Sequence, residues 1–397
     1  MTLKGAAAVF LTSLLALPIS YTLDSVSHTK SQGLIFLSSF ASCLAVAIAP
    51  WLILRNRLQK MDPFFYALSL LTYRSVQSLV IALENDGLIA QFMGFYLREG
   101  EPYLKTAHGT MVSYWDGIIH YSLYLMILAA VSWNQSFYDV GLYWFGSYGN
   151  GSLILVLGVF MGKDGIRSPL FLHLPLVALS LWAAVRFINE KRQECKTLQA
   201  QLKENDDSDG IAVSIWKRPV DLCFIIFFIL AAVLAVFRFI AAFGGSCDLI
   251  KQYTDKVEPY LADPLPYSKA QCMVHMLYFI PYYGLNIYGL LWPGQAWMPI
   301  WSLVFAGAAG QGQVSYIGSS FHYRTPYIHR VPQTAFARSI FWLVNGAMLV
   351  VPHLVAYRCQ SNWQFFLMDS QTEKVEDVSN SPSNGSVSGK NVSKKNE

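Results

Sequence analysis

Long apolar runs alternate with short polar gaps along this chain. A helix needs about 20 predominantly apolar residues to cross a bilayer, and this criterion predicts ten transmembrane helices. They lie at about residues 6–24, 33–54, 64–83, 110–133, 140–161, 169–187, 219–243, 270–292, 298–319 and 338–356. The fifth and ninth contain many glycine and polar residues, so the pattern defines their ends least well. The sequence therefore predicts an all-α polytopic membrane protein.

The composition agrees with this class and excludes others. Of the 397 residues, 54% are hydrophobic and 14% are charged, whereas a soluble domain carries about 25% charged residues. The net charge is only +4, and no basic stripe is interleaved with aromatic residues, so no nucleic-acid partner is expected. The six cysteines are scattered without a Cys-x-x-Cys pair, so neither a metal site nor another cofactor is expected.

The positions of the basic residues predict the orientation. The gap after the second span contains Arg55, Arg57 and Lys60, and the gap after the sixth span is also strongly basic. Cytosolic loops carry an excess of lysine and arginine, so both gaps and both termini are predicted to be cytosolic. Arg324 and Arg330 favour the opposite orientation, but they are outnumbered.

The polar C-terminal segment, after about Asp369, contains few apolar residues and is predicted to be disordered. It ends in "KKNE", with Lys394 and Lys395 fourth and third from the end. A cytosolic di-lysine ending resembles a retrieval signal of the endoplasmic reticulum, and the alternative is a merely basic tail. The ending predicts a location in the endoplasmic-reticulum membrane or in the adjoining ER–Golgi intermediate compartment.

The motif Glu-Pro-Tyr-Leu occurs twice, beginning at Glu101-Pro102 and at Glu258-Pro259, an interval of 157 residues (258 − 101). The same interval aligns "RSPLFLHLP" with "RTPYIHRVP" and, without a gap, Trp144 with Trp301. This predicts two four-helix units in the same orientation, a parallel repeat. Each motif is interpreted as a turn at a membrane surface, and the alternative is a carboxylate that serves a ligand mouth.

The repeat divides the chain into predicted domains. They are an N-terminal transmembrane hairpin at 1–60, a first unit at 61–187, a cytosolic linker at 188–216, a second unit at 217–357 and a disordered tail at 358–397.

Polar residues inside the spans of the first unit need partners, because charged groups in a bilayer are costly. Arg74 lies near the middle of the third span, and Asp116 lies about two turns into the fourth. Their depths differ by about 5 Å at 1.5 Å per residue, so an Arg74–Asp116 ion pair is predicted, with a structural clamp as its simplest role. His120 shares a helical face with Asp116, and the two are candidates for acid/base work or, with Trp115, for lining a ligand site.

The second unit carries a different polar set, namely His275, Gln311, Gln313, Tyr316 and Asn345. The simplest interpretation is helix packing, because small residues allow close approach and amide side chains join helices by hydrogen bonds. The alternative is a pocket in which these groups orient one end of an apolar ligand.

Several motifs together resemble a known family. They are "REGEPYLKTAHG", "YWDGIIHY", "GLYWFGS", "EPYLADP" and "HYRTPYIHRVP", which resemble the transmembrane-6 superfamily in order and across almost the whole chain. The resemblance implies that each unit is an EXPERA domain, the fold of the emopamil-binding-protein sterol isomerase. The second unit resembles the isomerase directly in "GQGQVSYIGSSFH" and in Asn345 followed seven residues later by Pro352.

The chain departs from the isomerase at the residues that carry its chemistry. The isomerase's His and Glu on the first helix of its domain fall on Thr72 and Val76 here. Its later Glu falls on Val274 and its Trp on Met348. Moving a double bond requires a proton donor and a proton acceptor, so isomerase activity is not expected, although Asp116 matches the acidic position of the first unit.

The resemblance implies a non-enzymatic endoplasmic-reticulum regulator of lipid metabolism, with roles in secretion of triglyceride-rich lipoproteins, in lipid-droplet content and in cholesterol balance. The expected mechanism is binding of membrane lipid, either a sterol or an acyl lipid, in one or both units, with lipoprotein-assembly proteins as further partners. The alternatives are an isomerase variant that uses Asp116 and His120, and a scaffold with vestigial pockets.

Overall fold

The computed structural model describes residues 3–26, 32–54, 63–163, 165–204, 214–245, 247–292 and 294–367. Within these ranges every regular element is a helix, which confirms the predicted all-α class. Seven helical segments of this described part are long and apolar enough to cross a membrane. They are Gly5–Ser25, Phe64–Asn85, Ala107–Ser132, Tyr138–Met161, Ser168–Gln201, Pro219–Ala242 and Ala335–Ser361. The chain is therefore a multi-pass membrane protein.

The other three predicted spans, 33–54, 270–292 and 298–319, are also helical, but their helices are broken, shorter or more polar. One of them, α13 (Met298–Phe321), contains two glutamines and several serines and glycines, yet most of its side chains are buried. Neighbouring helices rather than lipid surround α13, so the bilayer does not require it to be apolar. The count of ten spans remains a prediction.

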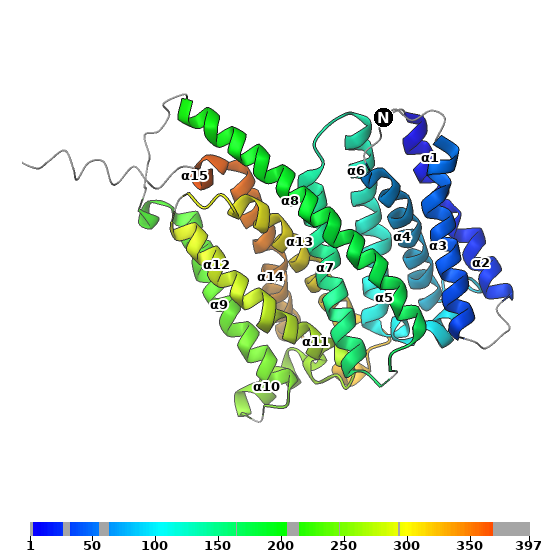
Figure 1. Cartoon of the computed structure of the whole chain (residues 1–397). Helices are drawn as coiled ribbons and strands as arrows, with labels where there is room; N and C mark the ends of the chain where they lie inside the picture. The colour runs from blue at the N-terminus through cyan, green and yellow to red at the C-terminus, as the bar shows by residue number, and fades with distance from the viewer. Residues whose placement is uncertain are drawn as a thin grey trace, which may run out of the picture.

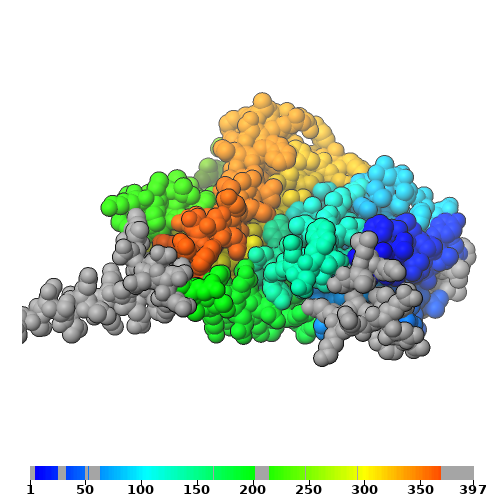
Figure 2. All heavy atoms as spheres, turned by 90° about the horizontal axis from the view of Figure 1, so that it is seen from above, coloured from blue at the N-terminus to red at the C-terminus, as the bar shows by residue number. Residues whose placement is uncertain are grey.

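The N-terminal region packs against the first helix of the first unit, α4 (Phe64–Asn85). It contains α1 (Leu3–Leu14), α2 (Ala16–Val26) and α3 (Gln32–Leu54). The first predicted span is thus broken at Leu15. Pro18 has no N–H to donate to the carbonyl one turn earlier, so a break just before it is expected. Figure 2 shows this blue region at one edge of the molecule, away from the orange C-terminal helices.

The other elements follow in two runs of similar order. The first run is α4, α5 (Ala107–Tyr114), η3 (Trp115–His120), α6 (Tyr121–Ser132), α7 (Tyr138–Met161) and α8 (His173–Glu204). The second is α9 (Pro219–Ala242), α10 (Asp248–Lys256), α11 (Pro266–Val274), η7 (His275–Phe279), α12 (Ile280–Leu291), α13 and α14 (Ala335–Ser361), with α15 (Trp363–Leu367) after it. In each run a π-helical turn, η3 or η7, interrupts the helix after the Glu-Pro-Tyr-Leu motif.

The two copies of the motif have the same backbone. Each forms a short 3₁₀-helix, η2 (Pro102–Lys105) in the first run and η6 (Pro259–Ala262) in the second. The glutamate before each proline has nearly the same φ and ψ, −129° and 72° at Glu101 and −129° and 68° at Glu258. The proline ring disfavours the α region for the preceding residue, and both glutamates lie outside that region.

The two runs meet where α7 crosses α13 in the middle of the molecule (Figure 1). A Cβ at Gly146 would overlap the carbonyl oxygen of Val304, and a Cβ at Gly307 would overlap that of Tyr143. The contact is reciprocal, since each glycine touches the residue three positions before the other. The equivalent glycines at the crossing are thus 161 residues apart (307 − 146), which is four more than the interval of 157 between the motifs. The gap-free alignment that pairs Trp144 with Trp301 therefore does not pair the residues that are equivalent at this crossing.

Two predicted boundaries differ from the observed helices. Residues 188–204, assigned to a linker, continue α8, and residues 358–367, assigned to the disordered tail, are helical. Arg358 in α14 donates to the buried carboxylate of Asp221 in α9 at 3.0 Å, and Phe366 is fully buried, so the segment 358–367 is part of the core. Lys394 and Lys395 lie outside the described residues.

Candidate functional site

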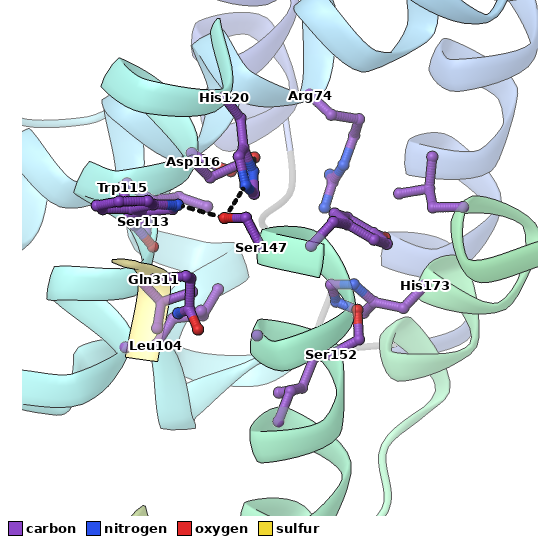
Figure 3. Close-up of a pocket in the computed structure, with 18 of the residues that line it drawn as sticks. Arg74, Leu104, Ser113, Trp115, Asp116, His120, Ser147, Ser152, His173 and Gln311 are labelled. Atoms are coloured by element: carbon purple, nitrogen blue, oxygen red, sulfur yellow. Dashed lines mark hydrogen bonds and ion pairs between the residues drawn. The ribbon is translucent and has the colours of Figure 1, made fainter. Parts of the chain in front are cut away.

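A cavity of about 120 Å³ lies within the first unit. Its walls come from α4, the first Glu-Pro-Tyr-Leu motif, α5, η3, α6, α7 and α8, with two residues of the second unit. One part of the wall is aliphatic, formed by Leu71, Ile81, Leu104, Val112, Leu155 and Leu176. The other lining residues are polar or aromatic, with two glycines, and Figure 3 labels several of the polar ones.

A chain of hydrogen bonds forms one polar part of the cavity. Oδ1 of Asp116 lies 2.8 Å from Nδ1 of His120, and Nε2 of His120 lies 2.8 Å from Oγ of Ser147 (Figure 3). Nε1 of Trp115 also donates to that Oγ, at 2.8 Å. A carboxylate accepts only, so Nδ1 of His120 carries the proton and Nε2 is left to accept from the serine hydroxyl. The three residues Trp115, Asp116 and His120 therefore lie on the wall of one cavity, and their role in binding a ligand stays a prediction.

The π-helical turn η3 carries three members of this chain. Such turns are rare and often lie at functional sites. Gly117 permits close contact between η3 and α4, because a Cβ there would lie 2.6 Å from Cβ of Leu79. This approach places Asp116 beside Ser75 of α4, whose hydroxyl donates to Oδ1 of Asp116 at 3.3 Å.

Arg74 and Asp116 line the same cavity, but the predicted direct ion pair is not formed between these two described residues. The carboxylate of Asp116 is taken up by His120 and Ser75. Nη1 of Arg74 donates instead to Oε1 of Gln77, one turn along α4, at 2.9 Å. The similar depth of the two residues in the membrane predicted the pair, but each side chain bonds to nearer partners on α4 and η3 instead. Arg74 extends into the cavity (Figure 3).

The first Glu-Pro-Tyr-Leu motif supplies a second polar part of the wall. Glu101 is only 2% exposed, and its carboxylate accepts from the hydroxyl of Tyr96 at 2.7 Å and lies 2.8 Å from Nε2 of His173. Burial alone would raise the pKa of Glu101, but the charge and hydrogen bond of His173, with the bond from Tyr96, lower it. Glu101 is thus an ionised, buried group on the cavity wall as well as part of a turn.

In the second copy of the motif, the glutamate forms a buried ion pair with an arginine. Glu258 is 0% exposed, and Nε of Arg238 donates to its Oε2 at 2.9 Å while Nη2 of Arg238 donates to its Oε1. Asn345 joins both, donating to Glu258 at 2.7 Å and accepting from Arg238 at 2.9 Å. The hydroxyl of Tyr316 lies 3.5 Å from the same carboxylate. Asn345 and Tyr316 therefore belong to a closed, buried ion-pair network.

The other candidates of the second unit are divided between the two bundles. Gln311 lines the first-unit cavity and accepts from Asn150 of α7, because the crossing of α7 and α13 directs it there. His275 bonds to Gln271 at 2.9 Å within its own unit. Gln313 is buried, and its amide has no hydrogen-bond partner among the described residues.

Three residues that organise these sites were not selected from the sequence, namely Ser147, His173 and Arg238. Arg238 had the same signal as Arg74, a charge within an apolar span, and that signal was sufficient to find it. Ser147 stands among glycines in a helix where small residues are typical of packing. His173 follows a proline-rich turn, and no local pattern connects it with Glu101.

Comparison with known proteins places the chain in a family. The protein-family model for the transmembrane domain of proteins like Transmembrane 6 superfamily member 2 matches residues 15–198, and the EXPERA model matches residues 246–359. The chain is 38% identical to mouse Transmembrane 6 superfamily member 2 over 357 residues, which cover 89% of this chain and 92% of the mouse protein. The chain belongs to the transmembrane 6 superfamily.

The rat and human relatives agree. Rat Transmembrane 6 superfamily member 2 is 38% identical over 371 residues, covering 92% of this chain and 95% of the relative. The human protein is 36% identical over 356 residues, covering 89% and 92%. No solved structure matches the chain. The cavity lies within the segment matched by the superfamily's own domain, apart from the two lining residues of α11 and α13.

Proposed function

We propose that this protein is an endoplasmic-reticulum regulator of lipid metabolism that binds a sterol or acyl lipid in the cavity of its first unit. The cavity carries the proposal, because it is lined mainly by apolar surface together with convergent polar groups, the usual composition of a small-molecule site. Binding would promote lipidation and secretion of triglyceride-rich lipoproteins and limit lipid-droplet content. Lipoprotein-assembly proteins are the proposed partners.

The size of the cavity limits what it encloses. An engineered apolar cavity of about 150 Å³ binds benzene, so about 120 Å³ holds a group of that scale and not a whole lipid. One end of the lipid, a sterol hydroxyl or an ester group, is proposed to lie near His120 and Ser147. The rest of the molecule would extend between the helices toward the bilayer.

The second unit is not proposed as a lipid site. Its interior charges are already paired, since Arg238, Glu258 and Asn345 satisfy one another. A ligand there would have to compete with a desolvated ion pair, whose disruption costs about 3–5 kcal/mol. Sterol isomerisation is not proposed either, because the residue after Cys272-Met273 is Val274, which is buried and has no proton to exchange.

Photoactivatable lipids test the proposal. The full chain in mild detergent is crosslinked to a photoactivatable sterol and to a photoactivatable fatty-acyl lipid, and the labelled peptides are mapped. Leu155→Trp fills the cavity wall and is expected to reduce labelling at least about tenfold. The matched control is Leu153→Trp on the same helix, where the side chain is 48% exposed and outside the cavity. Absence of labelling in every protein would favour the scaffold.

The compartment is proposed from the "KKNE" ending. Replacing Lys394 and Lys395 by alanine is expected to move the protein from the endoplasmic reticulum to later compartments, measured by microscopy against organelle markers. An unchanged distribution would show that the two lysines are not the address.

A further inference from the structure

The order of the hydrogen bonds in the cavity is that of a nucleophile, a general base and the carboxylate that orients the base. Hydrogen bonds of 2.8 Å each join Ser147 to His120 and His120 to Asp116. Ser147 is fully buried against the protein yet lines the cavity. We propose that this site cleaves carboxylic esters of lipids, with Ser147 as the nucleophile. The proposal rests on the proposed function, because the lipid must first enter the cavity.

The proton positions fit these roles. The carboxylate of Asp116 holds the proton of His120 on Nδ1, so Nε2 faces the serine with a free lone pair. The hydroxyl of Ser147 then donates to Nε2 and accepts from Nε1 of Trp115. A hydroxyl oxygen has two acceptor lone pairs, so Trp115 leaves one for attack. The same constellation occurs on unrelated folds and is recognised by geometry rather than by sequence order.

Arg74 on the cavity wall is placed to stabilise the negative charge that develops during ester cleavage. Attack on an ester produces a tetrahedral oxyanion, which preorganised donors stabilise. Arg74 extends into the cavity from α4 and is not consumed by a carboxylate, since its Nη1 donates to the neutral amide of Gln77. Because Arg74 and Asp116 are not paired with each other, both remain available for the proposed reaction. If Arg74 and Asp116 were bonded to each other, Asp116 could not orient His120 and Arg74 could not stabilise the oxyanion.

The reaction balances with water as the only co-reactant. Oγ of Ser147 bonds to the ester carbonyl carbon while Nε2 of His120 takes the hydroxyl proton. Collapse of the tetrahedral intermediate breaks the bond from carbon to the alkoxy oxygen, and His120 returns the proton to the leaving alcohol. Water then attacks the acyl-serine with His120 again as base, releasing the carboxylic acid and restoring the Ser147 hydroxyl. No electrons are gained or lost.

The surroundings favour a lipid ester over other acyl compounds. Six aliphatic side chains line the cavity, and its remaining space is about 120 Å³ within a membrane-spanning bundle. Such walls accept an acyl chain. A peptide substrate would bring buried backbone N–H and C=O groups, which must be hydrogen-bonded, and the aliphatic wall offers them no partners.

Covalent labelling of the wild-type protein tests the proposal directly. The full chain in mild detergent is treated with an alkyl fluorophosphonate, which modifies activated serines, and the adduct is located by peptide mass spectrometry. An adduct on Ser147 is expected in the wild type and none in Ser147→Ala. Labelling by His120→Gln is expected to fall more than 100-fold. Ser180→Ala is the matched control, since this buried serine on α8 donates to the carbonyl oxygen of Val177 on its own helix and is not one of the cavity's lining residues.

Turnover and lipid binding separate the possible outcomes. Hydrolysis of the 4-nitrophenyl esters of butyric and palmitic acid is expected in the wild type and lost in Ser147→Ala. Asp116 is a positioning residue, so Asp116→Asn is expected to lower kcat by up to about 10⁴-fold with KM little changed. A wild type without an adduct on Ser147, or with one retained in Ser147→Ala, overturns the ester-cleaving site. In that case, photo-lipid labelling of the first unit decides whether lipid binding survives alone.

Discussion

The two copies of Glu-Pro-Tyr-Leu make a matched experiment, because the same substitution can be placed in each. Glu258→Gln removes the charge that neutralises Arg238, whereas Glu101→Gln removes a charge whose partner is His173. We expect Glu258→Gln to be the more destabilising of the two, although both residues are almost fully buried.

The expected magnitudes follow from the partners left behind. Arg238 is 3% exposed and cannot lose its proton, so an uncompensated charge remains buried and costs about 3–5 kcal/mol. The side chain of His173 is 24% exposed, so water reaches it, and the new amide still accepts from Tyr96. Glu101→Gln therefore costs only a weakened hydrogen bond to each partner, about 1–3 kcal/mol.

The assay is unfolding of the full chain in mild detergent by added denaturing detergent, followed by helical circular dichroism. The double variant Arg238→Met/Glu258→Met is included, because replacing both charges removes the unpaired ion. It is expected to cost less than Glu258→Gln alone. If Glu101→Gln were as damaging as Glu258→Gln, or the double variant worse than the single one, the assignment of a closed ion pair to the second unit would be wrong.

Three further outcomes are expected. Gly146→Ala should cost about 1–3 kcal/mol or more in unfolding free energy, since its Cβ overlaps a carbonyl oxygen of α13, whereas Gly149→Ala, with open space around it, should not destabilise. Since the pKa of Glu101 is lowered on folding, its stabilisation is complete above its ordinary value of 4.5 and is lost as pH falls through the folded value. The difference in unfolding free energy between wild type and Glu101→Gln should therefore shrink below pH 4.5. Arg324→Met should cost about 1–3 kcal/mol in the same assay, because Arg324 of the second unit donates to carbonyl oxygens of Lys105 and Asn85 in the first.

Much of the helical architecture was accessible from the sequence. Apolar runs mark transmembrane helices strongly, because every backbone polar group in a bilayer must be satisfied within the segment. The pattern was less informative for 188–204 and 358–367. Residues 188–204 are mostly polar, yet they continue α8. Residues 358–367 follow a predicted span, yet Arg358 bonds them to Asp221 of α9. Such contacts are tertiary and leave no periodic signal.

The candidate site was only partly accessible. Asp116 and His120 were identified because helical spacing alone places them on one face. Ser147 comes from another helix, and its role depends on the distance between α7 and η3, which no local pattern encodes. Gln311 was assigned to the second unit by its position in the chain, but the glycine-mediated crossing of α7 and α13 directs it into the cavity of the first.

Similar motifs have reached opposite electrostatic arrangements in the two units. Both place a glutamate before Pro-Tyr-Leu and an arginine on the first helix of the bundle. In the second unit the two side chains bond directly, and Asn345 completes the network. In the first, Tyr96 and His173 occupy the carboxylate, so Arg74 remains on the wall of an open cavity. A closed pair satisfies both charges without a ligand, whereas separated charges with space between them leave room for one. The two units thus differ in the partner of the motif glutamate, which is Arg238 for Glu258 and His173 with Tyr96 for Glu101.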